Sequence, residues 1–366
     1  MARITTEAGL ERVFRGKRVL LTGHTGFKGG WMALWLRRLG AEVTGIALPP
    51  PTDPSFCKAV RLEELVDSRI GDIRSEQDFA RAVGGQDFDV VIHMAAQALV
   101  RASYTAPVDT YLTNVVGTAV VLEQARRMPS LKACVVVTSD KCYENREWVW
   151  GYRENDPMGG KDFYSSSKGC TELVAAAYRS AHFSRDDGPQ MAMVRAGNVI
   201  GGGDWAADRI VPDLVRSVET GEPTRIRSPR SVRPWQHVLE PVRGYLTVAA
   251  NMIENGAPYA GGWNFGPDRH GTVDVGTLAD MIVARWEGGP RYVVEPRAGD
   301  PHEARILRLD ITKAEVDLGW QPLLDIGETV GMTVDWYRNY HGNPDGIRAF
   351  SEAQLGRYAA LWERAG

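Results

Sequence analysis

Residues 18–36 read RVLLTGHTGFKGGWMALWL, in which a short apolar run gives way to glycines and then to apolar residues at helical spacing. The opening run predicts a strand. Met32, Leu36 and Leu39 lie on one face of a helix predicted over 31–39. Strand, glycine loop and helix follow one another directly, which is how a doubly wound α/β domain begins.

Short β-branched runs recur along the chain, with helical stretches between them. We expect strands at 18–21, 42–47, 89–93, 133–138 and 191–196. This alternation predicts that the fold class is α/β, with a Rossmann-type doubly wound parallel sheet. A strand pattern at 262–267 indicates that the chain returns to this sheet late.

Three glycines form a G-x-x-G-x-x-G pattern between the first strand and the first helix. Without side chains there, a pyrophosphate can approach the helix N-terminus, where backbone amides and the helix dipole favour an anion. The same spacing occurs in structural turns, but its position after the first strand favours a dinucleotide site. We expect this loop to bind the cofactor through Gly23, Thr25, Gly26, Phe27, Lys28 and Gly29.

Two further segments are expected to meet the dinucleotide. Asp72 and Ile73 follow a third strand and could receive the adenine, although an aspartate after a glycine also forms turns. After the fourth strand, Ala95, Ala96 and Gln97 lie where the backbone passes close to the cofactor. Tight packing explains the two small residues equally well.

The end of the second strand leaves the choice between NAD and NADP open. This strand ends at Ala47, and Leu48 and three prolines follow it. The acidic residue that usually binds the ribose in such folds is therefore missing at this place.

The second half of the chain is richer in glycine and proline, with three consecutive glycines at 201–203. This composition indicates a smaller, loop-rich C-terminal α/β lobe for the substrate, called the small lobe below. We expect the dinucleotide-binding domain to comprise 1–197 plus about 238–270, and the small lobe to comprise about 198–237 plus 271–366.

Charge and composition exclude several classes of partner. The chain carries 43 Lys and Arg against 46 Asp and Glu, a formal net charge of -3, so we expect no nucleic-acid partner. No apolar run reaches the roughly 18 residues that span a bilayer, so we expect a soluble protein without a membrane partner. The four cysteines lack CxxC spacing, and we expect no secretory leader, which together predict reduced thiols in the cytoplasm. We expect no metal site.

Tyr164 and Lys168 form a Y-x-x-x-K pattern, and residues four apart share one face of a helix. A phenol with a pKa of about 10 is a weak base at neutral pH, but a neighbouring ammonium and a positive nicotinamide ring favour the phenolate. The pattern is common by chance. Here it follows a glycine loop and a strand that ends at Thr138 and Ser139, which favours a proton-abstracting site.

The glycine loop, Ser139 and the Y-x-x-x-K pattern together resemble the extended branch of the short-chain dehydrogenase/reductase superfamily, which contains nucleotide-sugar enzymes. The resemblance covers nearly the whole chain. It implies a bound NAD and a triad in which Ser139 hydrogen-bonds the substrate oxygen and Tyr164 takes the hydroxyl proton. Lys168 would hold the ribose, so Tyr164 and Lys168 also count as cofactor contacts. The resemblance further implies a homodimer or homotetramer.

Asp140 and Lys141 directly follow Ser139 and add an acid and an amine to the triad. A nucleotide-sugar 4,6-dehydratase needs two such groups, one to remove the C5 proton and one to protonate the departing C6 hydroxyl. Hexose 4,6-dehydratases generally have Thr-Asp-Glu here, whereas Ser-Asp-Lys is similar to the CDP-glucose 4,6-dehydratases. Further stretches that resemble the same group are 23–29, 195–205 and 233–238.

This resemblance implies an NAD-dependent lyase that converts CDP-glucose to CDP-4-keto-6-deoxyglucose and water by internal hydride transfer from C4 to C6. The product would serve deoxysugar biosynthesis for surface polysaccharides such as O-antigen. Asp140 would be the acid and Lys141 the base, and a lysine is a base only when its pKa falls well below about 10.4.

Four alternatives remain open at this stage. The chain could be a nucleotide-sugar 4-epimerase that uses the triad alone, a dehydratase for another nucleotide hexose, or a catalytically silent NAD-binding protein of the same fold. Asp140 and Lys141 could also form a solvated turn after their strand.

The resemblance also assigns a substrate site. Asn198 and Arg233 would contact phosphate or sugar, and Arg209 would face the nucleotide. The remaining arginines of the small lobe are expected to be solvated. Trp205 and Trp235 lie within the resembling stretches and are expected to line the site, whereas the two tryptophans of the first helix are expected in the core.

Overall fold

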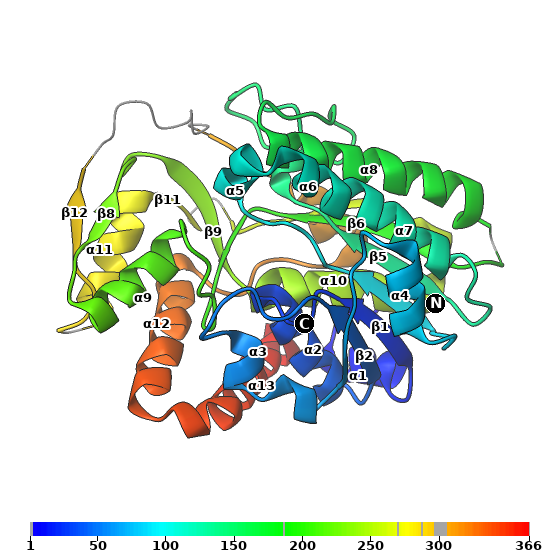
Figure 1. The fold of residues 1–366 in the computed structure, drawn as a ribbon, viewed down its shortest axis with the longest axis horizontal. Helices are drawn as coiled ribbons and strands as arrows, with labels where there is room; N and C mark the ends of the chain where they lie inside the picture. The colour runs from blue at the N-terminus through cyan, green and yellow to red at the C-terminus, as the bar shows by residue number, and fades with distance from the viewer. Residues whose placement is uncertain (1–2, 186, 269–270, 287, 296–305, 366) are drawn as a thin grey trace.

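The computed structural model describes residues 3–365 except 186, 269–270, 287 and 296–305. Within these residues, seven strands form one parallel sheet in the order β10-β6-β5-β4-β1-β2-β3 (Figure 1). Their bounds are β1 Arg18–Thr22, β2 Glu42–Ala47, β3 Asp67–Ile70, β4 Val90–His93, β5 Ala133–Val137, β6 Gln190–Ala196 and β10 Gly261–Phe265. The expected Rossmann-type sheet is therefore confirmed.

Helices cover both faces of the sheet because side chains along each strand alternate in direction. In β1, Val19 and Leu21 pack into one hydrophobic cluster, while Leu20 packs into another on the opposite face. The first cluster includes α1 Glu7–Phe14, α2 Phe27–Arg38 and α10 Leu239–Asn255. The second includes α4 Glu76–Val83, α7 Gly117–Ala125 and α8 Phe163–His182 (Figure 1). Shorter helices in the connections are α3 Phe56–Ala59, α5 Val100–Thr105 and α6 Pro107–Tyr111.

The small lobe begins directly after the carboxyl end of β6. One small sheet contains β7 Asn198–Ile200, β9 Val232–His237 and β11 Thr272–Asp274, and another contains β8 Thr224–Ile226 and β12 Tyr292–Val294. The helices of this part are α9 Ile210–Thr220, α11 Val275–Arg285 and α12 Ile326–Gly342 (Figure 1). The lobe therefore stands next to the edge of the main sheet at which its parallel strands end.

The five strands predicted from 18–21 to 191–196 agree with the structure to within one residue at each end, whereas the pattern at 262–267 runs two residues past the end of β10. The return of the chain to the sheet is also confirmed, because β10 pairs with β6. The helix that follows β1, however, is α2, and it begins at Phe27 rather than at residue 31. Gly26 is its N-cap, with φ -78° and ψ 166°, and the small residues of the first turn carry no apolar spacing that could reveal it.

The last helix, α13 Ile347–Ala365, packs on the dinucleotide-binding side, although the predicted division assigned 271–366 to the small lobe. The ring of Tyr358 meets Trp35 of α2 edge-on at 5.7 Å, and its hydroxyl donates to Glu240 Oε2 of α10 over 2.7 Å. The guanidinium of Arg243 lies 5.3 Å from the ring of Trp362. That part of the division needs correction, while the remaining boundaries stay a prediction.

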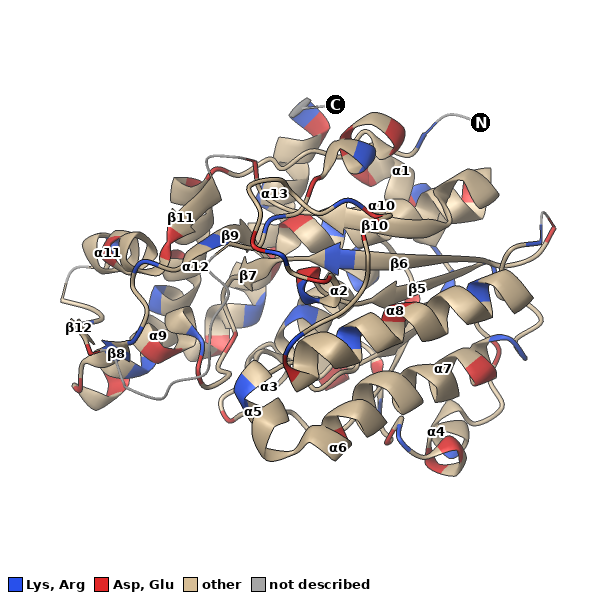
Figure 2. Cartoon of the chain, turned by 90° about the horizontal axis from the view of Figure 1, so that it is seen from above, with Lys and Arg blue, Asp and Glu red and all other residues tan. Residues whose placement is uncertain are grey.

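Lys and Arg are interspersed with Asp and Glu over the chain (Figure 2). No helix in the described ranges is long and apolar enough to cross a membrane. The four cysteines, Cys57, Cys134, Cys142 and Cys170, are free thiols.

Candidate active site

The glycine loop and the loop after β4 approach each other so closely that side chains are excluded. Gly23 has a φ of +78°, and a Cβ there would lie 2.7 Å from the backbone nitrogen of Ala95. A Cβ on Gly29 would overlap the carbonyl oxygen of Gly23. Gly26 caps α2 without a side-chain hydrogen bond, so the first amides of the helix are available to an anion. The loop therefore fits a pyrophosphate.

The other predicted residues of the loop have different surroundings. Thr25 Oγ1 donates to the carbonyl oxygen of Leu48 over 2.9 Å, which ties the loop to the end of β2. Phe27 is partly buried. The ammonium of Lys28 lies 5.7 Å from the ring centre of Tyr245. Burial, together with the positive charges of Arg209 and Lys168, lowers the pKa of Lys28 to about 7, although the charge of Asp140 acts in the opposite direction. Its side chain therefore belongs to the catalytic pocket.

The second pair of predicted cofactor residues lies in a turn after β3. The carboxylate of Asp72 forms an ion pair with Arg74 at 2.7 Å, and its hydrogen bonds with Arg74 lower the pKa of Asp72. The backbone N–H of Asp72 donates to Asp78 Oδ2 over 2.7 Å. Ile73 is buried against Gly117. Asp72 thus forms a turn, which was the alternative to adenine binding in the sequence analysis. A contact of Asp72 or Ile73 with adenine stays a prediction.

The loop over Ala95, Ala96 and Gln97 is fixed by a residue that the sequence did not point to. Asn114 is buried, and its side chain accepts from the backbone N–H of Gln97 over 2.8 Å and donates to the carbonyl oxygen of Gln97 over 3.1 Å. The same amide donates to Ser167 Oγ of α8 over 2.9 Å. Asn114 therefore ties the predicted cofactor loop to the helix that carries Tyr164 and Lys168.

Ser139, Asp140 and Lys141 come together at the carboxyl end of β5. Ser139 Oγ donates to Asp140 Oδ1 over 2.9 Å and accepts from the backbone N–H of Lys141 over 3.2 Å. Lys141 Nζ lies 3.5 Å from Asp140 Oδ1. The side chain of Asp140 is 1% exposed, yet its Oδ2 has no hydrogen-bond partner among the described residues. A buried carboxylate oxygen left in this way marks the place of a ligand.

Tyr164 and Lys168 are both buried on α8. Burial raises the pKa of Tyr164 to about 12, although a hydrogen bond with Ser139 and the charge of Arg209 lower it. Burial also lowers the pKa of Lys168 to about 8. The sequence predicted that the ammonium would favour the phenolate, but in the protein alone the desolvation of the phenol outweighs the nearby cations.

A buried ion pair holds the segment 139–142 at both ends. Arg195 of β6 donates to Glu172 of α8 through Nε over 2.7 Å and through Nη2 over 2.8 Å, and both side chains are 3% exposed. Thr138 donates its hydroxyl to Glu172, and Arg195 donates to the hydroxyl of Tyr143. Sequence reasoning missed this pair. The sequence did contain an indication of it, because Glu172 comes four residues after Lys168 and therefore lies on the same face of the helix.

The three predicted substrate residues have unequal surroundings. Asn198 follows Gly197, where a Cβ would lie 3.4 Å from Asp140 Oδ2, and the buried Oδ1 of Asn198 has no partner among the described residues. Arg209 forms an ion pair with Asp204 at 2.8 Å, and its charge acts on Tyr164. Arg233 donates to the carbonyl oxygen of Val232 over 2.9 Å and lies on β9. Asn198 and Arg209 therefore border the catalytic pocket.

Tryptophans expected at the site are buried instead. Trp205 is 5% exposed and packs edge-on with Trp336 at 5.5 Å and Tyr340 at 5.0 Å, so its expected place in the site wall is wrong. Trp235 is equally buried, and its indole donates to the carbonyl oxygen of Val273 over 3.1 Å. The tryptophans of α2 are in the core, as expected.

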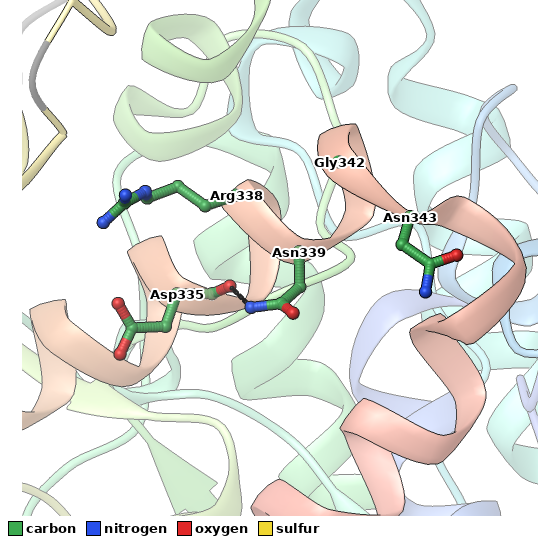
Figure 3. Close-up of a pocket in the computed structure, with 5 residues that line it drawn as sticks. All are labelled: Asp335, Arg338, Asn339, Gly342 and Asn343. Atoms are coloured by element: carbon green, nitrogen blue, oxygen red, sulfur yellow. Dashed lines mark hydrogen bonds between the residues drawn. The ribbon is translucent and has the colours of Figure 1, made fainter.

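A surface hollow of about 390 Å³ lies at the end of α12, away from these groups (Figure 3). Its lining residues are Asp335, Arg338, Asn339, Gly342 and Asn343. Asn339 donates to the backbone oxygen of Asp335 over 2.8 Å. None of the predicted site residues lines this hollow, so it carries no argument about catalysis.

The sheet, the glycine loop and the group around Ser139, Tyr164 and Lys168 define a nicotinamide-dependent enzyme of the short-chain dehydrogenase/reductase type. The chain belongs to the NAD dependent epimerase/dehydratase family, whose profile matches residues 19–260. It is 50% identical to CDP-glucose 4,6-dehydratase of Salmonella typhimurium over 89% of this chain and 91% of that protein. dTDP-glucose 4,6-dehydratase of Streptomyces antibioticus is 30% identical over 69% of this chain and 70% of its own.

Solved structures share the fold. UDP-glucose 4-epimerase of Thermotoga maritima, with UDP-glucose, is 25% identical with a TM-score of 0.73, covering 88% of this chain and 99% of its own. A dTDP-glucose 4,6-dehydratase of Streptomyces venezuelae, with NAD and TYD bound, is 24% identical with a TM-score of 0.73, covering 90% of this chain and 99% of its own. The family to which the chain belongs is NAD dependent, so NAD is the cofactor, which answers the question that the second strand left open.

We expect Lys168→Met to stabilise the protein at pH 7. Folding lowers the pKa of Lys168 from 10.5 to about 8. Below about pH 8 the folded protein must therefore bury a charged ammonium, which costs about 3 kcal/mol of stability. Between these values the unfolded chain binds the extra proton, so the stability of the wild type rises with pH. Urea unfolding at pH 7 and pH 10 should show the advantage of the variant shrinking. Exposed Lys132→Met is the control, and a less stable Lys168→Met at pH 7 would contradict the idea.

We expect Thr138→Val to lower kcat roughly tenfold or more, with little change in KM, because the hydroxyl that fixes the start of the segment 139–142 to Glu172 is lost. Steady-state kinetics measure the two constants. Thr333→Val removes a buried hydroxyl that bonds only within α12 and should leave both unchanged. An unaltered kcat in Thr138→Val would show that the bond does not position Ser139.

Proposed function

We propose that the chain is a CDP-glucose 4,6-dehydratase, which forms CDP-4-keto-6-deoxyglucose and water. The observation that carries this proposal is the pair Asp140 and Lys141 beside Ser139, in which the buried Oδ2 of Asp140 has no hydrogen-bond partner in the part of the chain that the structure describes. The similarity to CDP-glucose 4,6-dehydratase of Salmonella typhimurium supports the choice of substrate.

The proposed reaction begins with the C4 hydroxyl of the sugar. Ser139 hydrogen-bonds the C4 oxygen, and Tyr164 takes the hydroxyl proton. The glycine loop and Lys168 would hold NAD, which would supply the hydride acceptor for C4 and the hydride donor for C6. With the positive nicotinamide ring bound, the phenolate of Tyr164 would be favoured, which would offset part of the desolvation described above.

The ketone formed at C4 makes the C5 proton acidic, and the second pair of groups then acts. Lys141 removes the C5 proton, and Asp140 protonates the departing C6 hydroxyl, so that water leaves and a C5–C6 double bond forms. Lys141 then returns a proton to C5 as the hydride is added at C6, which gives the 4-keto-6-deoxy sugar. Lys141 is partly exposed, while Asp140 is buried 3.5 Å from it. This arrangement gives an acid enclosed by protein beside a base that can exchange its proton with solvent.

A nucleotide-sugar 4-epimerase is the second candidate. Its chemistry needs only Ser139, Tyr164 and Lys168, so Asp140 and Lys141 would have no chemical work. The buried Oδ2 of Asp140 favours the dehydratase, because it has no hydrogen-bond partner among the described residues and such an oxygen is costly to bury unless a ligand satisfies it. A dehydratase for another nucleotide hexose would use the same groups, and a silent NAD-binding protein would show no turnover.

The substrate diphosphate is assigned to the small lobe. Arg209 and Arg233 supply fixed positive charge for it, and the free Oδ1 of Asn198 supplies an acceptor for a sugar hydroxyl. The reaction would take place in the cytoplasm and feed deoxysugar biosynthesis for surface polysaccharides.

We also propose a homodimer, or a homotetramer built from it. Apolar side chains are exposed along α6 and the turns that follow, and on α8 beside them. Their relative exposures are 69% for Val108, 39% for Leu112, 43% for Val116, 39% for Phe163 and 63% for Leu173. A second copy that covers this face would remove the apolar surface from water.

The test of the proposed function is incubation of the purified protein with CDP-glucose, with dTDP-glucose in parallel, followed by mass spectrometry. Loss of one water from CDP-glucose is expected. No loss from either sugar, with NAD bound, would favour the epimerase or another nucleotide sugar.

We expect Lys141→Met to stop the reaction after the first oxidation. The variant retains Tyr164 and Lys168 but lacks the base for C5, so reduced cofactor should accumulate, visible by its absorbance, while water loss falls at least roughly a hundredfold. Lys161→Met, an exposed lysine nearby in sequence, is the control. Full dehydration by Lys141→Met would exclude Lys141 as the base.

A further inference from the structure

Asp208 occupies an unusual position in the loop between β7 and α9. Its φ of +60° is a left-handed conformation that side chains rarely adopt outside glycine, asparagine and aspartate. The side chain is about half exposed, at 46%. Non-glycine residues held in this region are concentrated at sites where the surrounding structure demands a particular side-chain direction.

The carboxylate of Asp208 bridges the two parts of the molecule. Its Oδ1 lies 3.5 Å from Arg101 Nη1 and 3.6 Å from Arg227 Nη2. Arg101 comes from α5, at the side of the large domain that faces the small lobe (Figure 1). Arg227 directly follows β8 of the small lobe. One oxygen therefore sits between two guanidinium groups from opposite sides.

The same place is suited to a larger anion. Arg209, the next residue, adds a third guanidinium and is close enough to Tyr164 for its charge to act on the phenol. Arg209 is also the N-cap of α9 and makes no side-chain cap bond, so the positive end of that helix points into the loop. Arg209 is itself paired with Asp204, so three guanidinium groups and a helix N-terminus meet two carboxylates, and the balance of charge stays positive.

We propose that Asp208 is an intramolecular stand-in for the substrate diphosphate: it holds Arg101 and Arg227 in the free enzyme and releases both to the diphosphate. The inference rests on the proposed function, since it requires a nucleotide diphosphate as ligand. A diphosphate carries more negative charge than one carboxylate, so Arg101 and Arg227 bind it in preference to Asp208.

If Asp208 competes with the diphosphate, removing its charge changes the affinity for ligand in the opposite direction from removing an ordinary ion pair. A structural pair at this exposure contributes little, and its loss would leave the affinity for ligand unchanged or weaken it. A competing anion must be displaced, so its loss strengthens binding.

The test is Asp208→Asn, with Kd for CDP measured by calorimetry and KM measured for CDP-glucose. Both constants should fall about fivefold, which corresponds to about 1 kcal/mol. Glu295→Gln is the matched control, because Glu295 is 51% exposed and pairs with Arg225 in the same lobe. Its constants should not change. An unchanged or larger Kd for CDP in Asp208→Asn would overturn the proposal.

Two further outcomes separate this proposal from the proposed function. In an Arg101→Ala background, Asp208→Asn should have a smaller effect on Kd, since one of the contested arginines is gone. An equal effect in both backgrounds would exclude Arg101 as a shared partner. If the wild type releases no water from CDP-glucose while Asp208→Asn still binds CDP more tightly, the dehydratase assignment fails and the stand-in survives.

Discussion

The ion pair between Glu172 and Arg195 is the constraint on which the catalytic arrangement depends. It joins α8, which carries Tyr164 and Lys168, to β6, and through Thr138 to the end of β5. Removing two charges from water offsets most of their attraction, so such a pair contributes little net stability. What it does supply is a fixed geometry. If either charge were lost, the other would remain buried and unpaired, and the elements would have to shift to reach water.

Much of the fold and part of the site follow from local sequence. The glycine loop could be predicted because Gly23 and Gly29 are required by backbone contacts that no side chain permits. The strands could be predicted because each is a short buried run, and parallel strands bury both faces. Ser139, Asp140 and Lys141 could be placed together since they are consecutive at the end of such a strand.

Other features depend on contacts between distant segments. Nothing in the sequence around Asn114 indicates that its side chain will form two hydrogen bonds with the backbone of Gln97. Trp205 lies in a stretch that resembles an active-site motif, but Trp336 and Tyr340, more than a hundred residues later, enclose it. The place of α13 is similarly set by Trp35 and Glu240. The rise in the pKa of Tyr164 could not be predicted, because it comes from burial of the phenol, and that burial depends on the whole fold.

The ammonium of Lys28 has a consequence for ligand binding. Burial lowers its pKa to about 7, so the uncharged amine is accessible to Lys28 near neutral pH, unlike an ordinary lysine. An anionic ligand that settles beside it favours the charged form and raises this pKa. Binding then draws a fraction of a proton from the buffer, so the measured heat depends on the buffer's own ionisation. The affinity for such a ligand accordingly declines as the solution becomes alkaline.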